Sequence, residues 1–595
     1  MPRPTRMSRN RLPGLRRTTS GMRFRTPSTG TTLTSQRSGR RTNPIRRRQS
    51  PSRQSLLGRR QHAGTIYSSH VRRGRTTRWT VGLEAGPPHE YRNLGNGREH
   101  RAMPRPSAGI ISLTPRQLMA SGSPHGRVYV EAAPGSGKTT VSALRFGLHR
   151  FAATTDRRAV VAVSFTRSAT EELRNRVIRH WGPSSVAWPH RIVTLDTLLC
   201  DLLFHLLQEG VLQWPGGHTD LEVLDTWRTA LPAKPGRMRP VLSVDSGQVV
   251  IRTVDESQSA SHPSPTDFRK AISEGRCTHD NVREALQGAL ATGEARKALT
   301  SYFETTIRSL TVDEVFDAND LDRDIFSLAA SGCRSLTLVG DPWQALYQFR
   351  GARPAAMTTY IRENSFTTHR LDESFRWGSD RQASLTRQLR RQMPVQLTPG
   401  LVQDANVVIA HRWQALWDAD PHVLPLAIKP GVGQVQEAIC TLLLNEITQH
   451  ALGLQAVFLP DALVTLGLEK EDLATTLHPL LQDAVSRLKD GALSRQVWQS
   501  LSDGLTDLIP ALAAQRYARN PLLALTRLQL RLGDDQLVPG LTCHQSKGRE
   551  WNTVAVKLST ADISALALGL DPAEADHRAL YVALTRARLN TLALT

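Results

Sequence analysis

From about residue 113 onwards, short apolar runs alternate with segments of helical periodicity. Three runs make this plan clear: VYV (128–130), VVAV (160–163) and LTLV (336–339), each leading into a loop or turn. Apolar runs without polar alternation are typical of strands that are buried on both faces, as in parallel sheets. The pattern therefore predicts an α/β fold with parallel sheets.

Two stretches interrupt this plan. Residues at about 200–305 begin helically with LLCDLLFHLLQEG, and their tract ESQSASHPSP (256–265) is predicted to be a loop. The stretch at about 430–535 is predicted to be mainly helical. Both stretches are therefore predicted to be insertions in this plan.

Charge is concentrated in residues 1–106, which contain 25 arginines, no lysine and three acids. This tail therefore carries +22 of the chain's net charge of +23. Its composition predicts disorder. Three interpretations compete: a nucleic-acid-binding arm, a transit peptide, or a mis-assigned start with translation beginning at Met103. We favour the last. Arginine greatly outnumbers lysine along the whole chain, which indicates GC-rich coding DNA, and such DNA often yields spurious upstream reading frames.

The five cysteines are widely scattered and form no C-x-x-C pair. This spacing argues against a zinc site, an iron–sulfur cluster or a disulfide framework. No apolar run reaches the length of a membrane span, and the N-terminus has no apolar core for a secretory signal. We therefore expect a cytoplasmic protein without a membrane partner.

A glycine-rich loop follows the first apolar run, within GRVYVEAAPGSGKTTVSALRF (126–146). Such a loop directs backbone N–H groups at phosphates, whereas the alternative, a chance glycine turn, does not explain the flanking strand and helix. Lys138 is predicted to reach the β- and γ-phosphates of ATP, and the Thr139 hydroxyl to ligate Mg²⁺. The predicted loop comprises Ala132, Ala133, Pro134, Gly135, Ser136, Gly137, Lys138, Thr139 and Thr140.

A second candidate element is VDEVFDAN (312–319), where the apolar run IRSLTV ends on clustered acids. A solvated turn is one interpretation, and a nearby cation is the other. In P-loop NTPases a strand ends in an aspartate that holds Mg²⁺. Asp313 is predicted to take this role, and Glu314 to orient and polarise the water that attacks the γ-phosphate. Asp317 is predicted to be structural.

Further motifs follow in order: LTPRQ (113–117), SFTRSATEEL (164–173), GDPWQALYQFRGA (340–352), LDESFR (371–376), TCHQSKGREW (542–551) and YVALTRAR (581–588). With the loop and the acids, they resemble the motifs of the UvrD/Rep/PcrA family of superfamily 1 helicases, across about four-fifths of the chain. The resemblance implies two RecA-like P-loop NTPase domains, at 107–372 and 373–595, each carrying a mostly helical insertion, with ATP in the cleft between them.

The resemblance also assigns roles to side chains outside the loop. Gln117 would read adenine, Phe375 would stack on it, and Glu550 would contact the ribose. Gln344 would sense the γ-phosphate. Arg376 and Arg586 would be arginine fingers that stabilise charge on the transferring phosphoryl group. The predicted catalytic residues are thus Lys138, Asp313, Glu314, Gln344, Arg376 and Arg586.

Single-stranded DNA would lie across both domains. Aromatic faces stack bases of any sequence, which suits a motor that moves along any strand. Core packing is the alternative for the aromatic residues, a structural histidine for His544, and an ordinary surface lysine for Lys547. The predicted DNA contacts are Phe165, Thr166, Tyr347, Phe349, Thr542 and His544.

Three positions depart from the family pattern. Asp196 stands where a histidine usually contacts DNA, and Thr140 replaces an arginine that helps to stack adenine. Phe316 replaces the glutamine of D-E-x-Q-D, so a polar link between hydrolysis and DNA is missing. Trp343 is unusual for its motif and has no assigned role.

These features predict an ATP- and Mg²⁺-dependent single-stranded DNA translocase and 3′–5′ helicase, in DNA repair or recombination. Its partner would be single-stranded or 3′-tailed duplex DNA; protein partners are unknown, and an RNA track is open. One alternative is a DNA-stimulated ATPase subunit that remodels nucleoprotein, or serves a defence complex, without unwinding alone. The other is a P-loop ATPase that does not act on nucleic acid.

Overall fold

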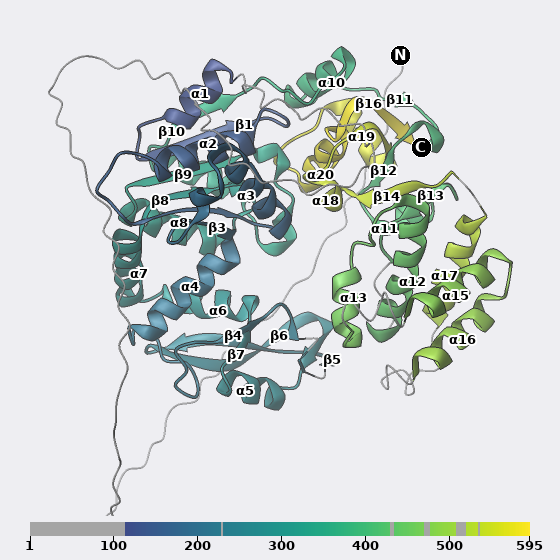
Figure 1. The fold of residues 1–595 in the computed structure, drawn as a ribbon, viewed down its shortest axis with the longest axis horizontal. Helices are drawn as coiled ribbons and strands as arrows, with labels where there is room; N and C mark the ends of the chain where they lie inside the picture. The colour runs from purple at the N-terminus through teal and green to yellow at the C-terminus, as the bar shows by residue number, and fades with distance from the viewer. Residues whose placement is uncertain are drawn as a thin grey trace, which may run out of the picture. The chain divides into compact units, whose positions relative to one another are not determined.

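The computed structural model describes residues 113–594, apart from residues 228–229, 232, 429–433, 469–476, 507–518 and 534–535 (Figure 1). The predictions for the arginine-rich tail, residues 1–106, lie outside the described residues.

The first sheet has six parallel strands. Their order is β10 (Thr367–Leu371), β1 (Arg127–Ala132), β9 (Ser335–Gly340), β8 (Ile307–Val312), β2 (Ala159–Ser164) and β3 (Arg191–Thr194). Every residue of β2, β8 and β9 is buried, because helices cover both faces of the sheet. The helices of this unit are α1 (Pro115–Gly122), α2 (Lys138–Arg150), α3 (Arg167–Trp181), α8 (Asp320–Gly332) and α9 (Pro354–Glu363).

The second sheet also has six parallel strands. Their order is β11 (Thr398–Pro399), β16 (Ala587–Leu594), β15 (Trp551–Lys557), β12 (Val407–Ala410), β14 (Val538–Thr542) and β13 (Val423–Pro425). Its helices are α10 (Asp380–Arg390), α11 (Trp413–Trp417), α18 (Cys543–Ser546), α19 (Thr560–Leu568) and α20 (Ala575–Leu584). The predicted α/β fold with two parallel sheets is confirmed.

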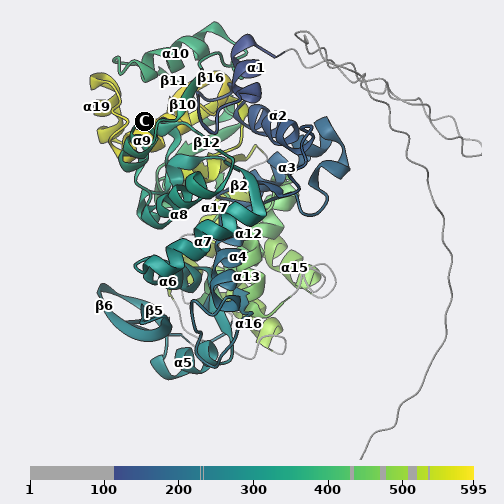
Figure 2. The same cartoon turned by 90° about the vertical axis from the view of Figure 1, so that its left-hand side faces the viewer.

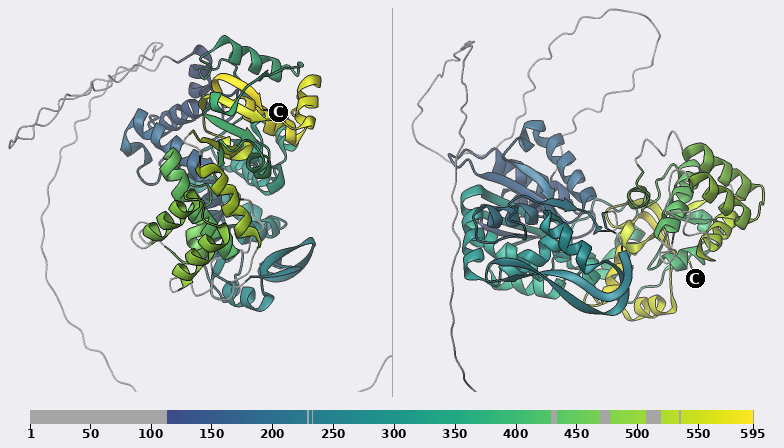
Figure 3. Two further views of the ribbon diagram at one scale, coloured as in Figure 1. Left: turned by 90° about the vertical axis from the view of Figure 1, so that its right-hand side faces the viewer. Right: turned by 90° about the horizontal axis from the view of Figure 1, so that it is seen from below.

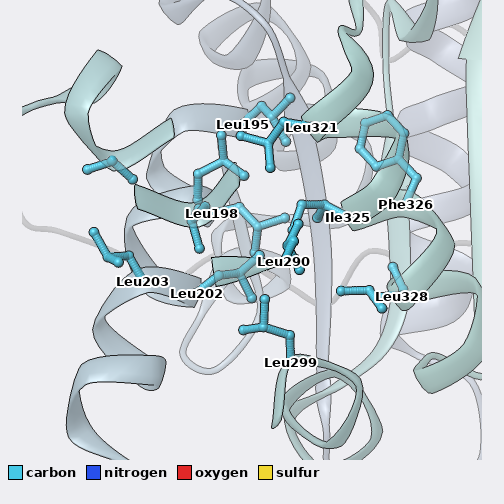
Figure 4. Packing of buried hydrophobic residues seen from close by; sticks show 14 of the residues in the cluster. Leu195, Leu198, Leu202, Leu203, Leu290, Leu299, Leu321, Ile325, Phe326 and Leu328 are labelled. Atoms are coloured by element: carbon cyan, nitrogen blue, oxygen red, sulfur yellow. The ribbon is translucent and has the colours of Figure 1, made fainter. Parts of the chain in front are cut away.

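The first insertion shares its core with the first sheet. Leucines of α4 (Leu195–Gln208) pack against α8 and against α7 (Gly293–Thr306), as Figure 4 shows for Leu195, Leu198, Leu299 and Leu321. The remaining elements are β4 (Glu222–Leu224), β5 (Ala233–Asp245), β6 (Gln248–Pro263), α5 (Pro265–Ser273), β7 (Arg276–Thr278) and α6 (His279–Ala289). This shared core fixes the insertion to the first unit.

Strands β5 and β6 form a long antiparallel hairpin, which projects from the neighbouring helices in Figures 2 and 3. The predicted loop at 256–265 is therefore wrong: residues 256–263 belong to β6, and α5 starts at Pro265. Pairing with β5 decides the conformation of this Ser-rich tract. The hairpin turn has positive φ at both Ser246 and Gly247, 50° and 77°. That geometry matches the right-handed twist of a hairpin, and the D-S-G signal between two alternating apolar runs had been overlooked.

The second insertion consists mainly of helices over its described residues, and its hydrophobic core also includes Trp417 and Leu424 of the second unit. These helices, green in Figure 3, are α12 (Gln434–Leu452), α13 (Leu459–Leu466), α15 (His478–Lys489), α16 (Ser494–Thr506) and α17 (Arg519–Leu532). Leu481, Trp498 and Leu525 belong to that core. In the described part of the chain, every helix is too short or too polar to cross a membrane.

Candidate active site

The glycine-rich loop joins the end of β1 to the start of α2. Gly137 caps α2 with a φ of 88°, and a Cβ atom there would lie 2.6 Å from Nε2 of Gln117. Gly135 has a φ of 73°, and its Cβ would lie 2.4 Å from Cβ of Arg376. Both positions therefore require glycine for backbone conformation and for space. Ser136 stabilises the turn, because its hydroxyl donates to the carbonyl of Ala133 (2.8 Å).

A cavity of about 930 Å³ adjoins this loop and is lined by residues of both sheet units. The predicted site residues that line it are Gln117, Gly135, Gly137, Lys138, Thr139, Thr140, Phe165, Thr166, Asp313, Glu314, Gln344, Tyr347, Phe375, Arg376, Glu550 and Arg586. Other predicted residues lie outside its lining: Ala132, Ala133, Pro134, Ser136, Phe349, Thr542 and His544. Of these, Ala133 and Pro134 line a second cavity of about 620 Å³.

The two acids at the end of β8 lie at the floor of the first cavity. Asp313 continues the strand pairing, since its N–H donates to the carbonyl of Val163 (2.9 Å), and its carboxylate accepts from the N–H of Glu314 (3.0 Å). Glu314 has left-handed backbone angles, φ 57° and ψ 40°. For a residue with a side chain this conformation costs on the order of 1–3 kcal/mol, and such strain is concentrated at functional sites.

The surroundings shift the pKa values of these two acids in opposite directions. Burial and the charge of Glu314 raise the pKa of Asp313 above its usual range. Burial would also raise the pKa of Glu314, but Lys138 and Lys547 outweigh it and hold that pKa below the usual range. Lys138 Nζ lies 3.6 Å from one Glu314 oxygen, and Lys547 Nζ lies 3.4 Å from the other. Glu314 is therefore ionised, as a group that polarises water must be.

Lys547 is a site residue that sequence reasoning missed. Its interpretation as an ordinary surface lysine is wrong, because its side chain is only 12% exposed and Nζ also lies 2.5 Å from Asp317. Asp317 in turn accepts from the N–H of Leu346 (3.1 Å). The ion pair joins α18 of the second unit to the acids of the first. No local signal marks such a lysine, because both partners are more than two hundred residues away in the chain.

The site fits a nucleotide phosphate. The ammonium of Lys138 is buried and makes no hydrogen bond to the described residues, so it needs an acceptor. Within the described chain no cluster of three or more His, Cys, Asp or Glu side chains could hold a metal ion. Mg²⁺ needs no such cluster, because it commonly takes one or two protein ligands together with phosphates and water. Thr139 and Asp313 would hold it here.

The predicted arginine fingers approach the cavity from the second unit. Arg376 donates to Glu550 (2.8 Å) and to the carbonyl of Thr585 (2.9 Å). Arg586 is 1% exposed and donates to the carbonyl of Val582 (2.9 Å). Burial and the charge of Arg376 lower the pKa of Arg586 from its usual value. An anion bound beside these two guanidinium groups, in addition to the Glu550 carboxylate, is therefore stabilised.

Gln344 belongs to a polar chain behind the cavity. Its Nε2 donates to Asp341 (2.7 Å), and Arg390 of α10 donates to the same carboxylate (2.9 Å). Trp343, which had no assigned role, is 7% exposed and packs on Tyr581 with ring centroids 4.9 Å apart. It therefore anchors the segment after β9 in the core of the second unit.

Three predicted DNA contacts form one aromatic cluster. The ring centroids of Tyr347 and Phe349 are 6.0 Å apart, and that of His544 lies 5.3 Å from Phe349. Phe349 is 69% exposed, so the core interpretation fails for it. His544 Nε2 also lies 3.2 Å from the carbonyl of Leu346. An exposed ring beside a histidine offers a stacking surface.

The other predicted DNA contacts have structural partners. Thr166 and Thr542 are N-caps, whose hydroxyls accept from Ala169 (3.2 Å) and Gln545 (3.4 Å) respectively. Phe165 packs partly against the first core while lining the cavity. Their contacts with DNA stay predictions.

The departures from the family pattern have distinct surroundings. Phe316 is buried and packs edge-on against Tyr129, with centroids 6.0 Å apart. Thr140 accepts from Arg176 of α3 (2.8 Å), so a guanidinium still lies at this end of the cavity. Asp196 accepts from Arg283 of α6 (2.8 Å), which also donates to Asp322 of α8 (2.8 Å). Asp196 therefore joins α4 to α6, and Arg283 ties both helices to α8 of the first unit.

This bridge predicts that Arg283→Met lowers the free energy of unfolding by about 3–5 kcal/mol, because Asp322 stays buried without its cation. Asp196→Ala should cost less, since its side chain is 37% exposed. Urea unfolding measures both effects, and DNA affinity should stay within about threefold, as for changes that touch no ligand. A selective loss of DNA affinity in Asp196→Ala would contradict a purely structural role.

The loop, the paired acids and the arginines that meet at one cavity define a P-loop NTPase with two RecA-like units. Comparison with known proteins supports a narrower class. Residues 113–216 and 273–364 match the family described as UvrD/REP helicase N-terminal domain. The unmatched residues between these ranges contain the hairpin β5–β6.

Similar proteins agree with this match. The ATP-dependent DNA helicase UvrD2 of Mycobacterium tuberculosis is 25% identical over 557 residues, covering 81% of this chain and 78% of its own length. The Mycobacterium bovis protein of the same name is equally similar. DNA helicase II of Escherichia coli is 24% identical over 291 residues, covering 45% of this chain and 39% of its own length. The chain is therefore similar to the UvrD/Rep-like helicases, and its first sheet unit matches their N-terminal domain.

Proposed function

We propose that this protein is an ATP-dependent DNA helicase, which translocates 3′ to 5′ along single-stranded DNA and takes part in repair or recombination. One observation carries the proposal: the cavity with the phosphate loop is lined by both RecA-like units. Relative motion of the units during ATP turnover can therefore move two DNA grips alternately. The names of the similar proteins support DNA as the track.

Each side chain has a place in this reaction. Lys138 binds the β- and γ-phosphates, and the loop N–H groups orient them. Bound Mg²⁺ neutralises charge on these phosphates. The Glu314 carboxylate accepts a hydrogen bond from the attacking water and polarises it. Arg376 and Arg586 stabilise the charge that develops on the transferring phosphoryl group. Gln117 and Phe375 hold the base.

The decisive test is ATP turnover with and without single-stranded DNA, with single-stranded RNA as a parallel arm. Turnover should rise strongly with DNA, and absence of stimulation by either strand would favour a P-loop ATPase that does not act on nucleic acid. Strand displacement on a 3′-tailed duplex, against a 5′-tailed one, then tests unwinding and polarity. Stimulation without displacement would favour the non-unwinding remodelling subunit.

Lys138→Ala is expected to lose both ATP turnover and strand displacement, by at least about 100-fold, because Lys138 is the only cationic side chain of the loop at 132–140. Lys270→Ala, an exposed change on α5, is the matched control and should behave as the unmodified protein. Retained turnover in Lys138→Ala would mean that the phosphate loop is misassigned.

A further inference from the structure

The segment after β9 belongs to the first unit by connectivity and to the second by packing. It contains Gln344 at the nucleotide cavity, and Tyr347 and Phe349 in the aromatic cluster. Trp343 and Leu346 nevertheless lie in the hydrophobic core of the second unit, together with Tyr581 of α20. The segment therefore spans from the nucleotide side to the stacking surface and is embedded in the opposite unit.

Arg578 of α20 holds this segment. Its Nε donates to the carbonyl of Ala345 (2.9 Å), and its Nη2 donates to Oε1 of Gln348 (2.7 Å). Its Nη1 donates to the carbonyls of Pro572 (2.7 Å) and Ala573 (2.9 Å), which belong to the second unit. The guanidinium thus bridges two acceptors of each unit.

The hydrogen bonds of Arg578 fix the orientation of its guanidinium group, although burial of that charge is unfavourable. It is 2% exposed, and among the described residues no carboxylate lies within ion-pair distance of it. Burial lowers its pKa from the usual value. A guanidinium is a rigid planar fork, so four acceptors in fixed directions determine its orientation. Such a group links α20 and the segment as one body.

Other side chains also contact this segment, among them Arg390 of α10, which donates to Asp341 (2.9 Å). Phe316 forms no polar side-chain contact with the segment, because its ring packs into the apolar core beside Tyr129. His544 contacts the carbonyl of Leu346, and Asp317 accepts from its N–H. Carbonyls of Ala345 and Leu346 are therefore both held by side chains of the second unit. Of these two side chains, Arg578 and His544, Arg578 also donates hydrogen bonds to the loop before α20 in its own unit.

We propose that Arg578 is a positioning residue that couples the nucleotide cavity to the DNA-stacking segment. The inference rests on the proposed function, since it assumes a DNA track. Arg586, just beyond α20, lines the nucleotide cavity. A displacement of α20 during ATP turnover is transmitted by Arg578 to the Ala345 carbonyl and the Gln348 side chain, which lie on either side of Tyr347 in the chain. The nucleotide bound at one site thereby changes the grip at the other.

Arg578→Gln tests this coupling in the full-length protein. DNA stimulation of ATP turnover should fall by about tenfold, a typical size for coupling between two sites, while turnover without DNA stays within about threefold. The difference in affinity for oligo(dT) between ADP and a non-hydrolysable ATP analogue should fall by a similar factor. Arg495→Gln, an exposed arginine of α16, is the control and should keep both values.

Gln348→Leu keeps Arg578 and removes one acceptor, so it should shift both readouts in the same direction by a smaller factor. It decides the question if Arg578→Gln does not fold. Unchanged DNA stimulation in folded variants would overturn the inference, and so would an equal loss of turnover with and without DNA. Absence of DNA stimulation in the unmodified protein would instead overturn the proposed function itself.

Discussion

Glu314→Gln is expected to lower DNA-stimulated ATP turnover by about 10²- to 10⁴-fold, the usual contribution of a general base. The amide has the same shape but cannot accept a proton or polarise water as an anion does. Lys138 and Lys547 keep the native carboxylate ionised and oriented, at 3.6 and 3.4 Å from its oxygens. Steady-state phosphate release measures the effect.

Nucleotide binding separates this effect from misfolding. Titration with a fluorescent ADP should give an affinity within about threefold of the unmodified protein, because Glu314 does not hold the phosphates in the proposed mechanism. Glu363→Gln, an exposed change at the end of α9, is the matched control and should leave turnover unchanged. Turnover above about a tenth of the control value would contradict the role of Glu314 as the base.

Lys547→Met is expected to damage both stability and turnover. Removing this cation leaves Asp317 buried without its ion-pair partner and Glu314 with Lys138 alone, which should lower the free energy of unfolding by about 3–5 kcal/mol. The pKa of Glu314 should rise, and its carboxylate loses one of two fixed contacts. Turnover should therefore fall by roughly 100-fold, as displacement of a reacting group by about 1 Å produces.

A double variant distinguishes the two effects of Lys547. Adding Asp317→Asn removes the buried charge that lost its partner, so thermal stability should partly recover, whereas turnover should stay low. Lys489→Met, an exposed change at the end of α15, is the control and should cost less than about 0.5 kcal/mol. Recovery of turnover together with stability would mean that Lys547 only supports the fold.

Much of the nucleotide side could be predicted because its signals are local. Gly135, Gly137 and Lys138 lie within one turn, where backbone conformation and phosphate chemistry restrict the residue types. Apolar runs without alternation predicted the parallel strands of the first sheet, since a strand covered on both faces must be apolar, whereas the second sheet was implied by the family resemblance. The order of the motifs predicted the helicase family. Residues that local backbone conformation or phosphate chemistry requires can therefore be recognised from the sequence.

The residues that connect the units could not be predicted. Lys547 and Arg578 look like ordinary basic residues, and their partners are more than two hundred positions away. The hairpin β5–β6 was missed for a related reason, because the pairing strand decides the conformation of a Ser-rich tract.

The sequence by itself determined the fold class, the phosphate loop and the acids of VDEVFDAN, because short-range sterics and phosphate chemistry leave few choices at these positions. Only the tertiary structure decided that Glu314 lies between two lysines, that Phe316 packs into the core, and that Arg578 joins the two units. The reason is physical: burial and ion pairing depend on which distant surfaces meet, and neither is encoded in the neighbours along the chain.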